Sequence, residues 1–420
     1  MQETAFVYYI YISNGVTSMG EFLKVVKYDE ALQKIKEHFP AGQVEEIPLL
    51  EAFNRVSTEV VLSPEPLPAF DRTTVDGYAV DAEDTFGCSE SLPAFLDLKG
   101  EVKMGEKADL TLQPGECCWI PTGGMLPEGS NAAVMVEYTE KLGEDTVLIY
   151  RPAGPWENIM QKGEDIAEGQ EVFPPGKKMR PQDIGLLASL GITSLKVFKP
   201  YNIGIISTGD EIIAVGDKPQ IGQIRDVNSY ALATAVQACG SNPRIYPIVQ
   251  DQFQELKKAV TLGLEENDVL LMSGGSSVGI KDVTIDVLLS FPDSELLFHG
   301  IAVKPGKPTL AVRIGKKLVI GLPGHPVSAL MMFYIVCAPA LRFTPAIEIA
   351  AFLSMNLPSQ AGRDDFVPVK LVYDNGRRIA IPLLGKSGLM SILSLADAYI
   401  HIEYEQQGIK QDDMVTAYIF

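Results

Sequence analysis

The stretch from residue 203 to residue 341 alternates apolar runs with amphipathic segments, and this alternation constrains the fold more than any other feature. Strand-like runs are predicted at 203–207, 244–249, 269–272, 308–314 and 318–320, and helices at 228–238, 253–263, 283–289 and 327–341. Alternating strands and helices form parallel sheets with helices on both faces. We therefore predict a doubly wound α/β domain with a mainly parallel sheet.

The flanking regions show other patterns. Helical spacing at 27–39 and again at 49–60 predicts two helices. Short β-type runs separated by Gly, Pro, Asp and Glu predict β-rich regions on either side of the α/β domain. At about 150 residues per domain, 420 residues suggest two to four domains. The expected parts are an N-terminal extension at 1–19, a linking and helical region at 20–62 and 166–195, a β-rich insertion at 63–165, the α/β domain at 196–344 and a terminal β domain at 345–420.

The net charge of −19 and pI of about 4.7 disfavour binding to nucleic acid or anionic lipid, and no basic patch offsets them. We expect neither nucleic acid nor membrane as a partner. The five cysteines form no C-x-x-C pair, which favours a reducing, cytoplasmic location. The apolar run at 327–341 is too short to cross a bilayer. The apolar run at 5–12 follows Glu3 rather than basic residues, which argues against a secretory signal.

Four predicted strands end in loops of glycines and polar residues, where ligands bind in open parallel sheets. The loops carry Asp210 and Glu211 after the first strand, Asp251 after the second, residues 273–282 after the third and residues 321–328 after the last. Small residues in the last two loops free backbone N–H groups to bind an oxyanion.

Two cations, Lys304 and Lys307, stand near these loops in sequence. Carboxylates beside anion-binding loops would repel a bare phosphate, so the combination favours a bridging divalent cation such as Mg²⁺. Each feature also has an ordinary structural interpretation. Asp282 can be a helix N-cap, Asp210 and Glu211 can belong to a turn, and Lys304 can be a solvated charge. Their recurrence at several strand ends favours a site.

The insertion contains Asp76-Gly77 between aromatic residues, together with glycine turns at 121–127 and 162–166. Taken alone, each is more typical of a turn than of a functional site. The four histidines are His38, His299, His325 and His401, too few and too scattered to support a histidine metal site or base.

Taken together, the polar segments form a specific series. They are Phe70-Asp71, Asp76-Gly-Tyr-Ala79, Thr122-Gly123, Gly163-Glu-Asp165, Ser207-Thr-Gly-Asp-Glu211, Ser273-Gly-Gly-Ser276 with Gly279 and Asp282, Lys304-Pro-Gly-Lys-Pro308 and Gly321-Leu-Pro-Gly-His-Pro-Val-Ser328. With these motifs the chain resembles the molybdopterin molybdenumtransferases, the MoeA family that includes the C-terminal domain of gephyrin. The resemblance covers residues 23–420.

The resemblance implies a multidomain α/β and β fold, with a doubly wound α/β molybdopterin-binding domain, a β-rich insertion domain and a C-terminal small β-barrel domain. It implies a transferase of molybdenum cofactor biosynthesis that inserts molybdenum from molybdate into adenylylated molybdopterin, with Mg²⁺-dependent release of AMP. It also implies a homodimer whose site joins the α/β domain of one subunit to the insertion of the other. A molybdopterin adenylyltransferase is a candidate partner.

The resemblance also assigns roles to individual residues. It implies catalytic roles for Asp76, Glu211, Asp282 and Lys304, and metal binding by Asp210, Glu211, Asp251 and Asp282. The implied substrate-binding residues are Thr122, Glu164, Asp165, Ser207, Thr208, Gly209, Asp251, Ser273, Gly274, Gly275, Ser276, Gly279, Lys307, Pro323, Gly324 and Ser328.

Some positions depart from the pattern of the family. Gly300 stands where many relatives carry Lys, and Pro368 replaces an Arg. Met160 and Gln161 stand where arginines are common. We expect Gly300→Lys to lower the molybdate requirement if Gly300 has no positive φ.

Other functions stay open from the sequence. Residues 275–279 fit the G-x-S-x-G elbow of a serine hydrolase with Ser277 as nucleophile. A non-catalytic scaffold on the same fold is a second alternative, which the retained carboxylates oppose. A third is a molybdopterin adenylyltransferase-like enzyme, which shares the α/β domain, but the match over the flanking β domains favours the molybdenumtransferase.

Overall fold

The computed structural model describes residues 25–274 and 283–420. These residues form two compact units, which we describe separately. The first contains Pro200–Phe420 and the chain up to Ala41, and the second contains Gly42–Lys199.

A six-stranded sheet with the order β16-β13-β17-β21-β20-β18 forms the core of the first unit. Its strands are β13 (Asn202–Ser207), β16 (Asn242–Ile245), β17 (Val269–Ser273), β18 (Ser294–His299), β20 (Leu310–Ile314) and β21 (Lys317–Leu322). The strands from β16 to β21 are parallel, whereas β20 and β18 are antiparallel. The predicted mainly parallel sheet is confirmed, with antiparallel strands at one edge.

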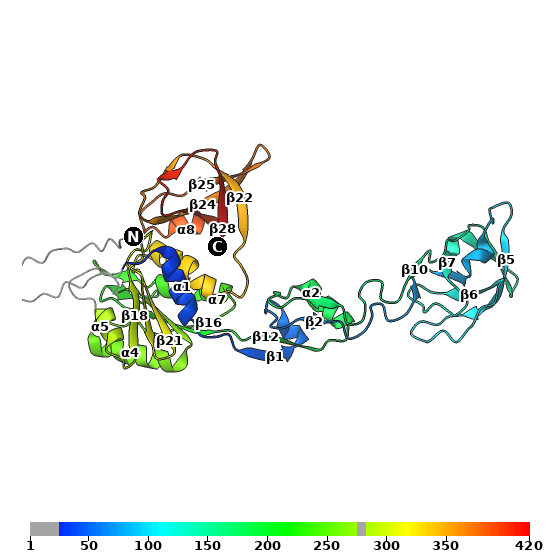
Figure 1. The fold of residues 1–420 in the computed structure, drawn as a ribbon, viewed down its shortest axis with the longest axis horizontal. Helices are drawn as coiled ribbons and strands as arrows, with labels where there is room; N and C mark the ends of the chain where they lie inside the picture. Colours follow the sequence, from blue (N-terminus) through cyan, green and yellow to red (C-terminus); the bar gives the residue numbers. More distant parts are fainter. Residues whose placement is uncertain (1–24, 275–282) are drawn as a thin grey trace, which may run out of the picture. The chain divides into compact units, whose positions relative to one another are not determined.

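Side-chain alternation along β17 explains why helices cover both faces of this sheet (Figure 1). Leu271 packs with residues of α1, α3 and α6, whereas Leu270 and Met272 pack with residues of α4 and α5. Every residue of β17 is buried, as expected for a central strand between two helical layers. The helices are α1 (Tyr28–His38), α3 (Asn228–Ala238), α4 (Phe253–Glu266), α5 (Val283–Leu289), α6 (Pro326–Met332) and α7 (Ala338–Leu341).

The predicted helix at 327–341 is interrupted. α6 continues through a π turn (Phe333–Cys337) into α7. Pro339 has no N–H to donate to the carbonyl of Ile335, four residues earlier. The hydroxyl of Tyr28 on α1 donates to that carbonyl instead, at 3.2 Å. This bond joins α1 to the irregular turn.

The end of the chain forms a closed β-barrel, which confirms the predicted C-terminal domain type (Figure 1). Its strand order is β24-β25-β22-β28-β26, and β26 pairs back with β24. β19 (Val303–Lys304) pairs with the start of β24, so the turn that follows β19 is attached to the barrel. The barrel region contains β22 (Glu348–Leu353), β23 (Leu357–Pro358), β24 (Asp364–Asp374), β25 (Arg377–Pro382), α8 (Ser391–Leu395), β26 (Ala398–Ile402), β27 (Gly408–Ile409) and β28 (Met414–Ile419).

The second unit contains the predicted β-rich insertion, built on a sheet with the order β7-β4-β6-β5-β9-β8. Gly77 is the first residue of β4, and a Cβ there would lie 1.9 Å from the Val134 backbone oxygen on β7. Asp76-Gly77 therefore leads into a strand and is not a hairpin turn. The strands are β4 (Gly77–Val80), β5 (Ala94–Glu101), β6 (Glu116–Ile120), β7 (Ala132–Met135), β8 (Thr139–Leu142) and β9 (Thr146–Ile149), with the pair β3 (Arg72–Thr73) and β10 (Ile159–Met160).

The rest of the second unit consists of short strand pairs and one helix. They are β1 (Val44–Pro48) with β12 (Ser194–Phe198), β2 (Val61–Leu62) with β11 (Glu171–Phe173), and α2 (Pro181–Ser189). The helix predicted at 49–60 is wrong. Only a 3-10 turn (Leu49–Ala52) forms, and Asn54 then adopts a φ of 63°. Ser57 and Thr58 donate their N–H groups to carbonyls of distant segments, which replaces helical bonding.

Of the helices in residues 25–274 and 283–420, none combines the length and apolar character needed to cross a bilayer.

Candidate functional site

The first candidate site is a cavity of about 440 Å³ at the carboxyl ends of β13 and β17, which we call the strand-end cavity. This is where an open α/β sheet presents polar loops to a ligand. Of the residues singled out from the sequence, the cavity is lined by Ser207, Thr208, Glu211, Ser273, Gly274, Pro323 and Gly324. The sequence thus predicted a large part of this lining.

Glycine is required where the chain leaves β17. Gly274 has a φ of 101°, and a Cβ on it would lie 2.0 Å from the backbone oxygen of Thr208. The N–H of Thr208 donates to the Ser273 carbonyl at 2.9 Å. The loops after β13 and β17 therefore pack backbone against backbone, which only glycine permits.

The acids predicted to bind a metal are partly brought together. The Thr208 hydroxyl donates to Asp251 Oδ1 at 2.5 Å, and the Asp251 N–H donates to Asp210 Oδ1 at 3.3 Å. Glu211, which follows Asp210 directly in the sequence, lines the strand-end cavity. Asp282 lies outside the described residues. Among the residues that the structure describes, no three His, Cys, Asp or Glu side chains form a group able to hold a metal.

This donor set is consistent with a Mg²⁺ ion that takes few protein ligands. Mg²⁺ binds through one or two carboxylates and completes its shell with substrate phosphate oxygens and water. Glu211 in the cavity lining is a carboxylate of that kind, and Asp210 and Asp251 lie in the loops at the same sheet edge, so these acids fit a Mg²⁺ ion that takes one or two of them.

The strand-end cavity is also lined by three residues that no sequence pattern indicated, Arg225, Asp226 and Asn228. Asp226 is buried, and its Oδ1 accepts bonds from the Ser207 hydroxyl and the Ser229 N–H, both at 3.0 Å. The signal that could have found them is the Arg-Asp-Val-Asn segment, whose last residue begins α3.

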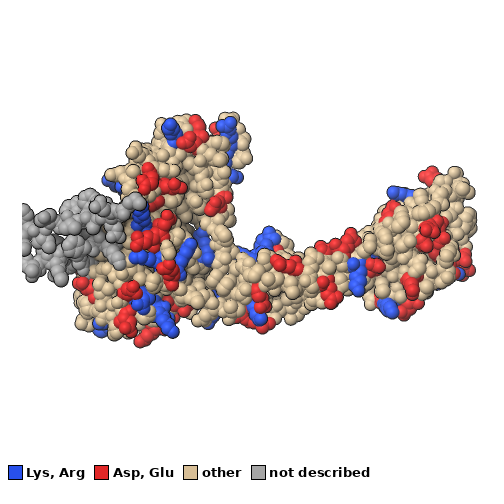
Figure 2. Space-filling model, viewed as in Figure 1, with Lys and Arg blue, Asp and Glu red and all other residues tan. Residues whose placement is uncertain are grey.

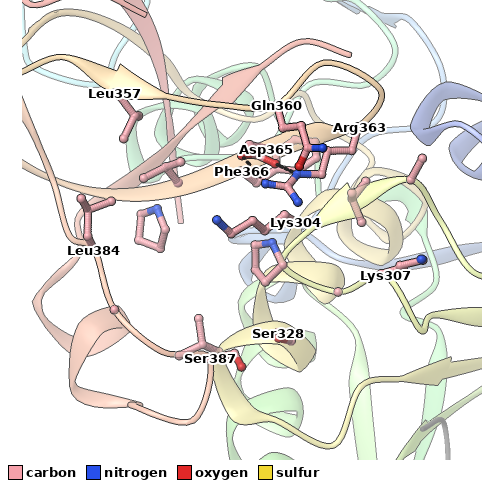
Figure 3. A pocket seen from close by; sticks show the side chains of 18 of the residues that line it. Lys304, Lys307, Ser328, Leu357, Gln360, Arg363, Asp365, Phe366, Leu384 and Ser387 are labelled. Atoms are coloured by element: carbon pink, nitrogen blue, oxygen red, sulfur yellow. Dashed lines mark hydrogen bonds and ion pairs between the residues drawn. The ribbon is translucent and has the colours of Figure 1, made fainter. Parts of the chain in front are cut away.

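A second cavity, of about 920 Å³, lies between the turn after β19, the start of α6 and the barrel, and we call it the barrel-side cavity (Figure 3). Lys304, Lys307 and Ser328, which the sequence singled out, line it. The barrel adds Arg363 and Ser387, which no local pattern indicated. Pro308 lines both cavities, so the two are adjacent.

The barrel-side cavity has a positive lining. Lys304, Lys307 and Arg363 are its cations, and Asp365 is the one acid among its lining residues. Asp365 is buried and pairs with the Arg363 guanidinium at 2.8 Å (Figure 3). The two lysines are therefore not neutralised by an acid of the lining, and the cavity suits an anion.

In the second unit, Asp76 and Thr122 form one polar turn. Asp76 Oδ1 accepts the Thr122 N–H at 2.6 Å and the Thr122 hydroxyl at 2.8 Å. These two bonds, the backbone bond first, lower the pKa of the Asp76 carboxyl, which is exposed. Asp76 is thus an ionised acid with a fixed orientation.

The other predicted residues of this unit are also exposed. Glu164 accepts the Gln161 N–H at 2.8 Å, and the Asp165 N–H donates to Leu67. These bonds support a turn, the ordinary interpretation given to 162–166.

Gly300 is buried and has a φ of 107°. A lysine there would be strained. The condition placed on Gly300→Lys is therefore not met, and we withdraw the expectation that it lowers the molybdate requirement.

The third predicted loop is described only at its start. Gly275, Ser276, Ser277, Gly279 and Asp282 lie outside the described residues. Gly209, at the end of β13, is described. It has a φ of 152°, and a Cβ on it would lie 2.9 Å from a Glu211 carboxylate oxygen.

Comparison with known families agrees with this arrangement over three successive regions of the chain. Residues 26–191 match the MoeA N-terminal region (domain I and II), residues 204–343 a "probable molybdopterin binding domain", and residues 350–420 the MoeA C-terminal region (domain IV).

Individual proteins are similar over most of their length. A molybdopterin biosynthesis protein of Methanocaldococcus jannaschii is 36% identical over 92% of this chain and 95% of its own. The molybdopterin molybdenumtransferase of Haemophilus influenzae is 31% identical over 92% of this chain and 97% of its own. Two crystal structures of the Pyrococcus horikoshii MoeA protein cover 94% of this chain and 99% and 100% of their own, with TM-scores of 0.82 and 0.81 at 34% and 32% identity.

Proposed function

The chain belongs to the MoeA family, and on that premise we propose that it is a molybdopterin molybdenumtransferase that transfers molybdenum from molybdate to adenylylated molybdopterin and releases AMP. The observation that carries this proposal is the pair of adjacent cavities with different linings. One presents carboxylates and loop amides at a sheet edge, and the other presents cations.

In this proposal the strand-end cavity binds the phosphate-bearing part of the substrate. The glycine-containing loops after β17 and β21 reach it through Gly274 and Gly324, and such loops present N–H groups to phosphate oxygens. Glu211, with Asp210, Asp251 and Asp282, would hold Mg²⁺ there. The ion would neutralise charge on the phosphates when it is bound.

The barrel-side cavity would bind molybdate. Molybdate carries two negative charges, and charge-assisted bonds from Lys304, Lys307 and Arg363 favour an oxyanion over a neutral ligand. The hydroxyls of Ser328 and Ser387 add polar groups to the same lining. Adjacency across Pro308 would bring molybdate close to the substrate held at the strand ends.

We further propose that the active form is a homodimer in which Asp76, Thr122, Glu164 and Asp165 serve the site of the partner subunit. Asp76 supports this, because Thr122 holds an ionised carboxylate in an exposed position where it can meet another surface.

The test is to incubate the protein with adenylylated molybdopterin, molybdate and Mg²⁺ and to measure both AMP and active cofactor. We expect AMP and active cofactor to form together, and neither to form without Mg²⁺. Failure to release AMP under these conditions would contradict the proposal. Addition of ATP and molybdopterin in place of the adenylylated substrate tests the adenylyltransferase alternative, for which we expect no nucleotide consumption.

A further inference from the structure

Three hydroxyl groups lie at the strand ends that line the strand-end cavity, and their protons are used differently. The Ser207 hydroxyl donates to Asp226 Oδ1 at 3.0 Å, and the Thr208 hydroxyl donates to Asp251 Oδ1 at 2.5 Å. Both protons are held by carboxylates, so these two groups offer a ligand only lone pairs. Lone pairs repel the oxygens of a phosphate.

Ser273, at the end of β17, has a different partner. Its Oγ accepts a hydrogen bond from Nδ2 of Asn228 at 2.6 Å, and the same Nδ2 donates to the Gly324 carbonyl at 2.8 Å. A carbonyl can only accept, so the bond to Gly324 fixes which end of the Asn228 amide faces the cavity. Ser273 Oγ is therefore an acceptor toward Asn228, and within residues 25–274 and 283–420 no hydrogen bond uses its own proton, which leaves that proton for a ligand.

The position of Asn228 makes this arrangement stable. It is the first residue of α3, and it joins the start of that helix to the ends of β17 and of the β21–α6 loop. All three segments line the strand-end cavity. Asn228 Oδ1 is buried and has no hydrogen-bond partner among residues 25–274 and 283–420, so the bonds of Nδ2 are what hold this amide in the described part of the chain.

We propose that Asn228 is a positioning residue that makes the Ser273 hydroxyl a hydrogen-bond donor to a phosphate oxygen of the substrate. The inference rests on the proposed function, which places the phosphate in the strand-end cavity. An acid in place of Asn228 would accept the Ser273 proton, as Asp226 and Asp251 do for the neighbouring hydroxyls. The amide instead leaves one hydroxyl of the three as a donor.

The test is a double-mutant cycle on the binding of AMP, measured by calorimetry in the presence of Mg²⁺. We expect Asn228→Ala and Ser273→Ala each to weaken AMP binding about tenfold or more, the range for loss of a hydrogen bond to a charged group. Because Asn228 acts through Ser273, the double variant should bind AMP within about twofold of Ser273→Ala alone. Asn242→Ala is the matched control, because Asn242 donates to Asn202 on the same sheet but does not line the cavity.

A purely structural tie to Gly324 would give a different result. Asn228→Ala would then weaken binding by the same factor with or without the Ser273 hydroxyl, and this additivity would overturn the inference. Thermal unfolding of each variant checks its folding, and Asn228→Ser replaces Asn228→Ala if the latter does not fold. If the wild-type protein binds no AMP, the proposed function fails and the inference fails with it. If the wild type binds AMP but the cycle is additive, the inference alone fails.

Discussion

Glu211 stands apart from the other acids at the sheet edge because it lines the strand-end cavity. The Asp210 carboxylate instead accepts the Asp251 N–H, and the Asp251 carboxylate accepts the Thr208 hydroxyl. Glu211→Gln keeps the size of the side chain and removes its charge. We expect the rate of AMP release to fall about tenfold or more, equivalent to about 1.4 kcal/mol in the activation free energy. We also expect half-maximal activity to need a higher Mg²⁺ concentration, which a Mg²⁺ titration measures.

The matched control for this change is Glu265→Gln, an exposed acid on α4 outside both cavities. It should leave the rate and the Mg²⁺ requirement unchanged. If Glu211→Gln needs the same Mg²⁺ concentration as the wild type for half-maximal activity, Glu211 does not bind the metal.

The cations of the barrel-side cavity predict a separate phenotype, because they would contact molybdate rather than phosphate. Lys304→Ala and Arg363→Ala should each raise the molybdate concentration for half-maximal rate by the equivalent of roughly 1.5 to 3 kcal/mol. Kinetics at varied molybdate measures this, with the exposed Lys316→Ala as control. If both variants need no more molybdate than the wild type, the anion lies elsewhere.

For single residues, the sequence indicates the cavity-lining residues that lie in glycine-containing loops, but it does not indicate those that the barrel supplies. Lys304 belongs to a Lys-Pro-Gly-Lys-Pro turn that any reading of the chain finds. Arg363 reaches the same cavity because β24 pairs with β19, which joins Val303 to Asp364, 61 residues later. Ser387 reaches it because its carbonyl accepts the Val327 N–H at the start of α6. Strand periodicity shows which residues are buried and does not show which distant loop they meet.

The sequence pattern predicts a secondary-structure element correctly where hydrogen bonds between residues close in sequence determine its conformation. The helix predicted at 228–238 is α3, with the same bounds. The strand predicted at 244–249 ends at Ile245 in β16, because Pro247 follows and has no N–H for the ladder. The 49–60 segment has helical periodicity, but its N–H groups bond to distant carbonyls, which no local pattern reveals.

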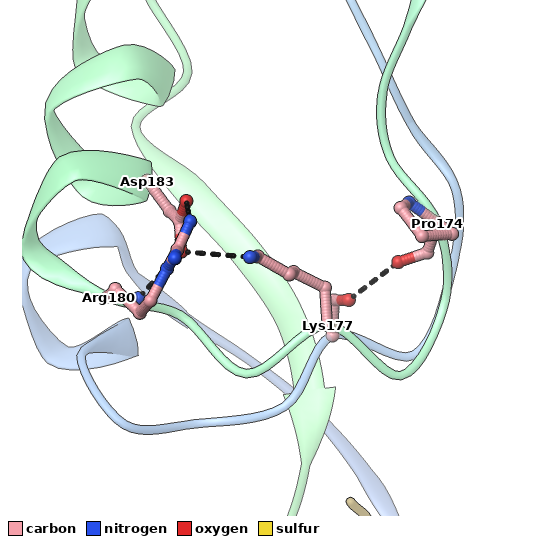
Figure 4. Close-up of polar contacts among 5 residues, drawn as sticks. Pro174, Lys177, Arg180 and Asp183 are labelled. Carbon is pink, nitrogen blue, oxygen red and sulfur yellow. Dashed lines mark hydrogen bonds and ion pairs between the residues drawn. The ribbon is translucent and has the colours of Figure 1, made fainter. Parts of the chain in front are cut away.

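Helix α2 shows how one carboxylate secures an element. Asp183 Oδ2 accepts the Arg180 backbone N–H at 2.9 Å, and the Arg180 guanidinium binds both carboxylate oxygens at 2.9 and 3.0 Å (Figure 4). Lys177 lies 3.5 Å from the same group. The bonds from Arg180, chiefly those of its side chain, lower the pKa of Asp183 from 3.8 to about 2.

This pKa predicts a defined pH dependence of stability. Because the pKa is lower in the folded protein, Asp183 stabilises the fold above about pH 4, and this contribution is lost as the pH falls toward 2. Asp183→Asn should therefore reduce the unfolding free energy at pH 7 by about 2 kcal/mol. The difference from wild type should shrink between pH 4 and pH 2, as measured by urea unfolding.

The exposed Asp109→Asn in the same unit serves as the control and should show no such convergence. A constant difference between wild type and Asp183→Asn across this pH range would show that the carboxylate charge does not stabilise α2.

For the molecule as a whole, Asp and Glu outnumber Lys and Arg by 54 to 35, and Figure 2 shows both kinds of charge spread over the visible face. A cavity with three cations and one acid in its lining is therefore more specific than its size alone suggests. The local field there opposes the net charge of −19. The net negative charge of the protein repels a small dianion at long range, so it does not steer the dianion toward the cavity. Salt screens this repulsion, and the cations of the cavity can hold the dianion once it makes direct contact. Molybdate binding should therefore depend on direct contacts more than on steering.

The final prediction concerns how the two compact units cooperate. Asp76 belongs to one unit and Glu211 to the other. If the site joins residues of two subunits, a heterodimer of Asp76→Ala and Glu211→Gln subunits contains one site with both native acids and one site with neither. If each site lies within one subunit, both sites of that heterodimer are defective.

An equal mixture with random exchange should thus recover up to about one quarter of the wild-type AMP release if the site is shared, and none if it lies within one subunit. Each variant alone is the control for background activity, and mass spectrometry of differently tagged subunits verifies that exchange has occurred. Verified exchange without recovery would contradict a site shared between subunits.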